Sequence, residues 1–503
     1  MMGTRLIKGK VVLLLILTVA ILLGSYLKMR NSAWHRIKDP ETVAMLKRFI
    51  SMKKAQAYGD TNGVPPEIGT MFKYAERGDW RALDHSMSDL QVRIQYWASL
   101  GHGIRHWHGV RGAIEDFVSD AVEKVGLHWE PKDPPRLEGT YGEAIKEVHG
   151  ALEAFVVGDE SYSRKFGQEI IHSIPPGSVF LSGDDTGRFV VTAMCQLQPE
   201  GDPFFIISPQ WLLDMGYCHY LRSMYGNTIY IMTDEDVERY LQDFYAQAER
   251  EYLSHKKMFS LRDGDGPAKE FFDKNPDREF FIEPYPGFES LTPYLEPHGL
   301  IAKVNRQPSP EISADIVKKD QDYWSDFIRP MIGDWLDDKT AVPQIAEFVE
   351  RVYLRNEFDR FHGDPVYVKN TYAQGEFVRT RVSIAEMYQL RAANSTDPDI
   401  KKRMNAAADF AFRQAWVLGP SLPEAVYPYI NFLVSQGRLG ESLLIVQASF
   451  GLTAAGDRRE ALRTMEETLK EHIKTNQTNI EPKWILFLEH ADSRGRYVEP
   501  DYP

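Results

Sequence analysis

Three short apolar runs near the middle of the chain constrain the fold more than any other sequence feature. The expected strands are residues 179–182, 204–207 and 228–232, and each is followed by a segment with helical spacing of apolar residues. The runs are continuously apolar, which is typical of strands buried on both faces of a parallel sheet. This alternation predicts a Rossmann-like α/β domain with a parallel sheet in three layers.

Helical patterns flank this domain on both sides, so the predicted fold class is α/β plus α. A further short strand is expected in GLIAKV at 299–304, and Thr233 followed by Asp236 is a variant of the helix capping box. The predicted organisation is a cytoplasmic tail and anchor at 1–38, a helical region at 39–173, the α/β domain at 174–310, a helical connector at 311–375, helical repeats at 376–475 and a C-terminal tail at 476–503.

The turn GDDTGR joins the first predicted strand to the following helix, at the edge where open α/β sheets bind ligands. The candidate ligand-binding residues are Gly183, Asp184, Asp185, Thr186, Gly187 and Arg188. Two carboxylates and an arginine suit a sugar hydroxyl or a group bound to a divalent cation better than a bare phosphate. The alternative is a capped turn in which Arg188 pairs with an aspartate. We expect no cofactor, and a cation held by Asp184 and Asp185 is the one exception considered.

Residues 11–27, VVLLLILTVAILLGSYL, predict a single N-terminal membrane span with basic residues on both sides. A cleaved signal peptide is the alternative, but Gly24 and Ser25 followed by Tyr26 make a poor cleavage site. Basic residues on both flanks leave the orientation nearly undecided by charge. Because N-terminal anchors usually keep a short tail in the cytoplasm, we expect the bulk of the chain on the extracytoplasmic (periplasmic) side of the cell membrane.

The C-terminal third predicts tetratricopeptide-like helical repeats. One repeat fits the spacing of small, aromatic, small and proline positions in full, and a second fits in part. The residues assigned to repeat packing are Ala408, Phe412, Ala415, Pro420 and Gly437. Repeats of this kind present a groove to other proteins, so a protein partner is expected here.

Net charge, cysteines and histidines argue against several kinds of partner and site. A net charge of −13 argues against nucleic acid as a partner. Cys195 and Cys218 are expected to be buried free thiols rather than a disulfide. His102 and His106 lie one helical turn apart, but no carboxylate follows at ligand spacing, and hydrogen-bonded histidines are favoured over a metal site.

Four stretches in matching order give the chain a resemblance to a known family. They are IIHSIPPGSVFLSGDDTGRFVVTAMCQ, LRSMYGNTIYI, EPHGLIAKVNRQPSPEI and FAFRQAWVLGPSLPEAVYPYINFLVSQGRL. Over residues 140–455 the chain resembles the C-terminal soluble region of bacterial multi-pass membrane proteins of the protein O-mannosyltransferase-like family. The resemblance places Gly183, Asp184, Thr186, Gly187, Arg188 and Phe189 on family-like positions, with Asp185 where one family form has proline.

The resemblance does not extend to the family's catalytic half, because this chain has one candidate span instead of many. No catalytic residue is therefore carried over. We expect a membrane-anchored extracytoplasmic binding or scaffold protein that is accessory to envelope glycosylation or assembly. The alternative is an enzyme, a transferase or hydrolase for a sugar or phosphate substrate at the GDDTGR turn, with Asp184 or Asp185 as base or metal ligand and Arg188 as anion clamp. A purely structural membrane scaffold is a third option.

Overall fold

The computed structural model describes residues 32–59, 63–105, 137, 139–183, 186–195, 202–243, 266–283, 291–309, 311–453 and 456–475. Within these residues the protein is mostly helical and has one small mixed sheet. The chain forms two compact units. The first consists of Met1–Glu160 with Asp214–Gly226, and the second of Ser161–Leu213 with Asn227–Pro503.

The described part of the first unit is helical. Its helices are α2 (Ala33–Arg36), α3 (Pro40–Tyr58), α4 (Pro66–Arg77), α5 (Trp80–Arg105), α7 (Gly139–Val156) and α10 (Met215–Tyr225). Local chemistry explains the boundaries of these helices. The Asp39 side chain accepts hydrogen bonds from the first turn of α3, and Gly78 ends α4 in a left-handed conformation with φ of 68°.

A buried lysine ties three helices of this unit together. Lys53 of α3 forms an ion pair with Glu147 of α7, and its ammonium donates a 2.7 Å hydrogen bond to the hydroxyl of Tyr220 in α10. The same hydroxyl donates to Glu147 over 2.7 Å. Because Lys53 is fully buried, these bonds replace the water that both charges lose on folding.

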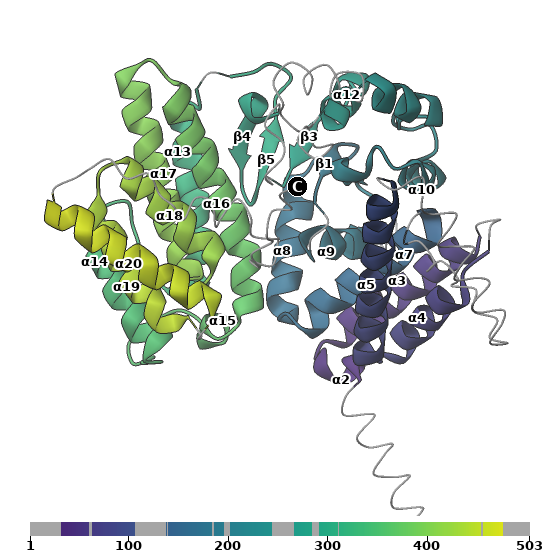
Figure 1. Cartoon of the computed structure of the whole chain (residues 1–503), viewed down its shortest axis with the longest axis horizontal. Coiled ribbons are helices and arrows are strands. Elements are labelled where there is room, and N and C mark those ends of the chain that lie inside the picture. Colours follow the sequence, from purple (N-terminus) through teal and green to yellow (C-terminus); the bar gives the residue numbers. More distant parts are fainter. Residues whose placement is uncertain are drawn as a thin grey trace, which may run out of the picture. The chain divides into compact units, whose positions relative to one another are not determined.

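The second unit contains the sheet and the remaining helices (Figure 1). Its elements are α8 (Glu160–Ser173), β1 (Val179–Leu181), α9 (Thr186–Cys195), β2 (Phe205–Ile207), η1 (Pro209–Trp211), α12 (Gly266–Lys274), β3 (Phe280–Ile282), η3 (Thr292–Tyr294), β4 (Leu295–His298), β5 (Ile301–Val304), α13 (Ala314–Ile332), α14 (Val342–Phe348), the π-helix η4 (Val349–Leu354), α15 (Pro365–Val368), α16 (Thr371–Asn394), α17 (Pro398–Leu418), α18 (Pro423–Ser435), α19 (Leu439–Leu452) and α20 (Asp457–Thr475).

The strand order of the sheet is β2-β1-β3-β5-β4. β1 runs parallel to both β2 and β3, with Phe180 opposite Ile206 on one side and Phe281 on the other. β3 and β5 pair antiparallel, as do β5 and β4. The predicted fold class is therefore wrong: the protein is mostly helical with a small mixed sheet, and a three-layer Rossmann-like domain is not shown.

The third predicted strand is one reason for this error. Residues 227–232 form no strand, and β3 takes the expected place beside β1. Ile229, Ile231 and Met232 are buried, as an apolar run should be. The backbone of Tyr230, however, pairs with a side chain: its N–H donates to Asn275 Oδ1 over 2.8 Å, and its carbonyl accepts from Asn275 Nδ2. An apolar run alone does not separate a strand from a buried extended loop.

The predicted membrane span at residues 11–27 lies outside the described residues. Among the helices that the structure does describe, none combines the length and the apolar character needed to cross a membrane. The N-terminal transmembrane helix of the predicted fold class is therefore not shown within the described residues.

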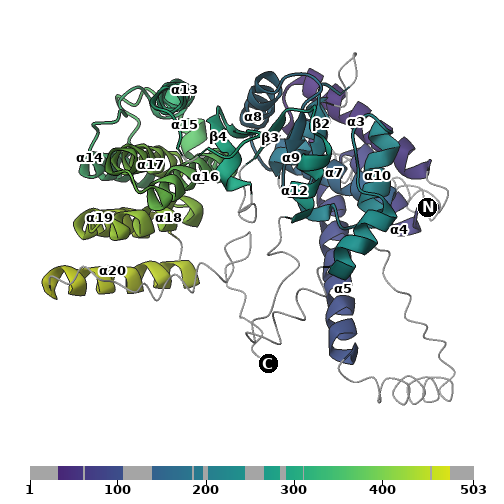
Figure 2. The ribbon, with the colours of Figure 1, turned by 90° about the horizontal axis from the view of Figure 1, so that it is seen from above.

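Helices α16 to α20 stack in chain order, and each contacts the next. Figure 2 shows them in successive layers that end with α20 (yellow). Phe412 of α17 lies in this stack, with its ring 5.7 Å from that of Tyr429 and 5.3 Å from that of Phe432, both in α18. Gly437 makes the turn into α19 with φ of 71°.

Replacing Lys53 by methionine should lower the free energy of unfolding by about 3–5 kcal/mol, because it leaves the buried Glu147 carboxylate without its cation. The matched control is Lys54→Met, which breaks the exposed pair between Lys54 and Glu76. This control should change the free energy by less than about 1 kcal/mol. Urea unfolding followed by circular dichroism measures both variants, and equal losses would contradict the role assigned to Lys53.

Candidate functional site

The three parallel strands end at one edge of the sheet, where the GDDTGR turn was predicted. Ser182 follows β1, Ser208 follows β2 and Glu283 follows β3, and all three are buried. The backbone N–H of Ser182 donates to Ile207 O over 3.0 Å, and that of Glu283 donates to Leu181 O over 2.9 Å. The parallel pairing therefore continues to the rim and brings the side chains of Ser182 and Glu283 together.

The structure places part of the predicted turn at this edge. Gly183 is buried two residues after the end of β1, Thr186 is the first residue of α9, and Gly187 and Arg188 are buried in its first turn. Arg188 is only 2% exposed, although its side chain is long and charged. Asp184 and Asp185 lie outside the described residues, so the expected cation site is not described either. In the described part of the chain, no cluster of three or more His, Cys, Asp and Glu side chains could hold a metal ion.

Glu283 is the residue at this edge that sequence reasoning missed. Its carboxylate accepts a 2.8 Å hydrogen bond from the hydroxyl of Ser182 and is 4% exposed. It also lies against the first turn of α9, because a Cβ atom built on Gly187 would be 3.0 Å from Glu283 Oε1. A negative charge is favourable near a helix N-terminus. Glu283 therefore occupies the space that an anionic ligand would otherwise approach.

Four of the other predicted site residues are buried among the C-terminal helices, and the fifth, Gly437, is exposed. Ala408, Phe412 and Ala415 lie on α17 with no exposed surface, while Pro420 and Gly437 lie in the turns on either side of α18. Cys195 and Cys218 are buried free thiols, as predicted. Burial raises the pKa of the Cys195 thiol, and Asp202 adds to this, so the thiol is unreactive at neutral pH.

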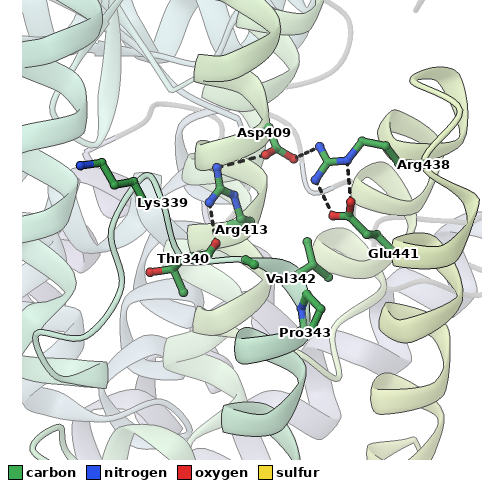
Figure 3. A pocket seen from close by; sticks show the side chains of 9 residues that line it. Lys339, Thr340, Val342, Pro343, Asp409, Arg413, Arg438 and Glu441 are labelled. Carbon is green, nitrogen blue, oxygen red and sulfur yellow. Dashed lines mark hydrogen bonds and ion pairs between the residues drawn. The ribbon is translucent and has the colours of Figure 1, made fainter.

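A second polar site lies among the C-terminal helices, and we name it the charged cavity. Its volume is about 470 Å³, which is within the range of ligand pockets. It is lined by Lys339, Thr340, Ala341, Val342, Pro343, Asp409, Arg413, Arg438 and Glu441 (Figure 3). These residues come from the loop before α14 and its first turn, from α17, and from the start of α19.

Ion pairs of alternating sign cross one wall of the charged cavity (Figure 3). Asp409 bridges two arginines, at 3.0 Å from Arg413 Nη2 and 2.7 Å from Arg438 Nη1. Arg438 also donates to Glu441 through Nε and Nη2. Burial lowers the pKa of Arg438, but Glu441 and Asp409 raise it by more, so the net pKa lies above its ordinary value and the side chain stays charged.

Arg413 and Arg438 differ in how firmly their side chains are held in place. Arg413 is held by its Nη1 atom, which donates to the carbonyl oxygens of Thr340 over 2.7 Å and Asp338 over 3.1 Å. The side chains of Arg438 and Glu441, in contrast, are 32% and 35% exposed. Asp409 and Arg413 are neighbours at i,i+4 on α17, which is a signal present in the sequence. The sequence gives no signal for the contacts that these two residues make with other segments of the chain.

Replacing Gly187 by alanine should lower the free energy of unfolding by about 1–3 kcal/mol, because the new Cβ would crowd Glu283 Oε1 and Phe166 Cε1, each 3.0 Å away. Gly375 in α16 is the matched control, since a Cβ there meets nothing within 4 Å. Gly375→Ala should instead stabilise the protein by about 0.5–1 kcal/mol through helix propensity. Denaturant unfolding measures both. A gain of stability in both variants would show that Glu283 does not pack against α9.

Comparison with known proteins supplies no family for this chain: no family model, curated protein or solved structure matches it. The resemblance to protein O-mannosyltransferase-like proteins therefore stays a prediction from the sequence.

Proposed function

We propose that the protein is a binding or scaffold protein that holds a partner protein at the charged cavity of its C-terminal helices. One observation carries the proposal: the polar groups at the two sites differ in access to solvent. At the sheet edge, Ser182, Arg188 and Glu283 are almost wholly buried. At the charged cavity, about a third of Arg438 and of Glu441 is exposed beside a space large enough for a ligand.

This difference supports the binding function over the enzymatic function, the two that are expected from the sequence. A catalytic site at the GDDTGR turn requires side chains that can reach a substrate. Of the described residues there, Ser182 and Glu283 bond to each other, and the carboxylate is pressed against α9. Partly exposed ion pairs set the specificity and rate of protein association, so the charged cavity favours binding over catalysis.

The predicted anchor gives this binding role a setting. If residues 11–27 hold the chain in the cell membrane with its bulk on the extracytoplasmic side, the partner is an envelope protein. The resemblance then makes an accessory role in envelope glycosylation or assembly the natural proposal. The stack from α16 to α20 gives the charged cavity a rigid support, because Asp409 and Arg438 bridge α17 and α19 across it.

Affinity capture from gently solubilised membranes tests the proposal with charge-reversal variants. Lys339 lines the cavity and is exposed, so Lys339→Glu should leave the fold intact. We expect it to lower recovery of the partner at least about fivefold, because one reversed charge changes the complementarity of the interface. Lys402→Glu is the control, since Lys402 is an exposed residue of α17 that does not line the cavity.

Quantitative mass spectrometry of the captured proteins measures the recovery. Identical sets of envelope proteins with the wild type and both variants would contradict the proposal. Recovery of cytoplasmic proteins alone would overturn the extracytoplasmic setting.

A further inference from the structure

The geometry points to an acidic peptide segment as the ligand of the charged cavity, with one carboxylate placed between Lys339 and Arg438; this inference rests on the proposed function. Charge, side-chain freedom and the apolar rim of the cavity each support it.

The charges that line the cavity do not cancel. Lys339, Arg413 and Arg438 are cationic, whereas Asp409 and Glu441 are anionic, which leaves one positive charge in excess. Asp337, which does not line the cavity, interacts electrostatically with Lys339 and offsets part of this excess. One carboxylate neutralises it. A phosphate monoester brings more than one negative charge at neutral pH and would be left partly unpaired.

Side-chain freedom identifies the groups that receive the carboxylate. Lys339 is exposed, and no hydrogen bond or ion pair engages its ammonium within the described residues. Figure 3 shows it pointing away from the ion pairs, but its long flexible stem can turn toward a bound anion. Arg438 is partly exposed and already shares its donors between two carboxylates, so a third can exchange with Glu441.

Arg413 forms the fixed wall of the site. Two backbone carbonyls and Asp409 hold its Nη atoms, and its buried Nε has no hydrogen-bond partner in the described part of the chain. Arg413 therefore stays in place when a ligand binds, and Lys339 and Arg438 supply the contacts to the carboxylate.

The rim before α14 supplies apolar contacts for the residues that flank the carboxylate. Ala341 and Pro343 are exposed, and Val342 is buried between them. These small side chains leave room for other small apolar side chains and offer no further charge. The preferred ligand is thus a single acidic residue between small apolar residues, rather than a run of acidic residues.

Two synthetic peptides test this inference on the full chain. One is the acetylated and amidated peptide AVEVA, and the other is its neutral analogue AVQVA. Isothermal titration should show at least about fivefold tighter binding of the glutamate peptide to the wild type. The preference should disappear in Lys339→Gln and in Arg438→Gln, and persist in the control Lys402→Gln. Because the contact is ionic and partly exposed, higher salt should weaken it.

Equal binding of the two peptides to the wild type would overturn the inference, and so would tighter binding of the phosphoserine analogue AV(pS)VA. The two proposals fail separately. If capture of a partner depends on the cavity but the glutamate peptide has no advantage, the ligand class is wrong and the binding function stands. If the glutamate peptide binds at the cavity but capture never depends on it, the ligand class stands and the proposed function is wrong.

Discussion

Strand β1 hydrogen-bonds to a parallel strand on each side, and the second unit depends on this pairing. Val179 aligns with Phe205 on one side and with Phe280, far along the chain, on the other. All three residues of β1 are buried, so their peptide groups must be satisfied inside the sheet. The same pairing brings Ser182 and Glu283 to one edge, and the antiparallel strands β5 and β4 continue the sheet beyond β3.

Buried ion pairs define which helices meet in each unit. In the first unit, Lys53 and Glu147 join α3 to α7. In the second, Arg381 of α16 donates to both carboxylate oxygens of Asp320 in α13, over 3.0 and 2.9 Å, and Tyr388 donates to the same carboxylate. Burial raises the pKa of Asp320, and Arg381 opposes that shift. Such pairs add little to the free energy of unfolding, but separating the two partners leaves a buried charge without its counter-ion. They therefore disfavour other pairings of these helices.

The polar groups of the two sites differ in access to solvent, and the proposed binding function depends on this difference. The Ser182 and Glu283 pair joins the end of β3 to the end of β1 and lies against α9, which stabilises the sheet edge. The ion pairs of Asp409, Arg438 and Glu441 hold α17 and α19 together as well, yet part of each outer group remains in contact with water. These outer groups are the ones that the proposed ligand would contact.

Features that depend on a few neighbouring residues were predictable from the sequence. The capping box is confirmed, because Thr233 and Asp236 each accept a hydrogen bond from the other's backbone N–H over 3.1 Å. The strand before the GDDTGR turn, the helix after it and the strand in GLIAKV are confirmed as well. The spacing of apolar residues, helix capping and turn formation each depend on a few consecutive residues. They can therefore be read directly from the sequence.

The tertiary structure decided the partners of these elements. Residues 227–232 and 280–282 are both apolar runs, and only pairing with β1 made the second of them a strand. Glu283 resembles any other loop carboxylate until β3 places it beside Ser182 and Gly187. The charged cavity likewise exists only where Thr340, Asp409 and Arg438 meet. Such contacts depend on which distant segments pack together, and local periodicity carries no information about that choice.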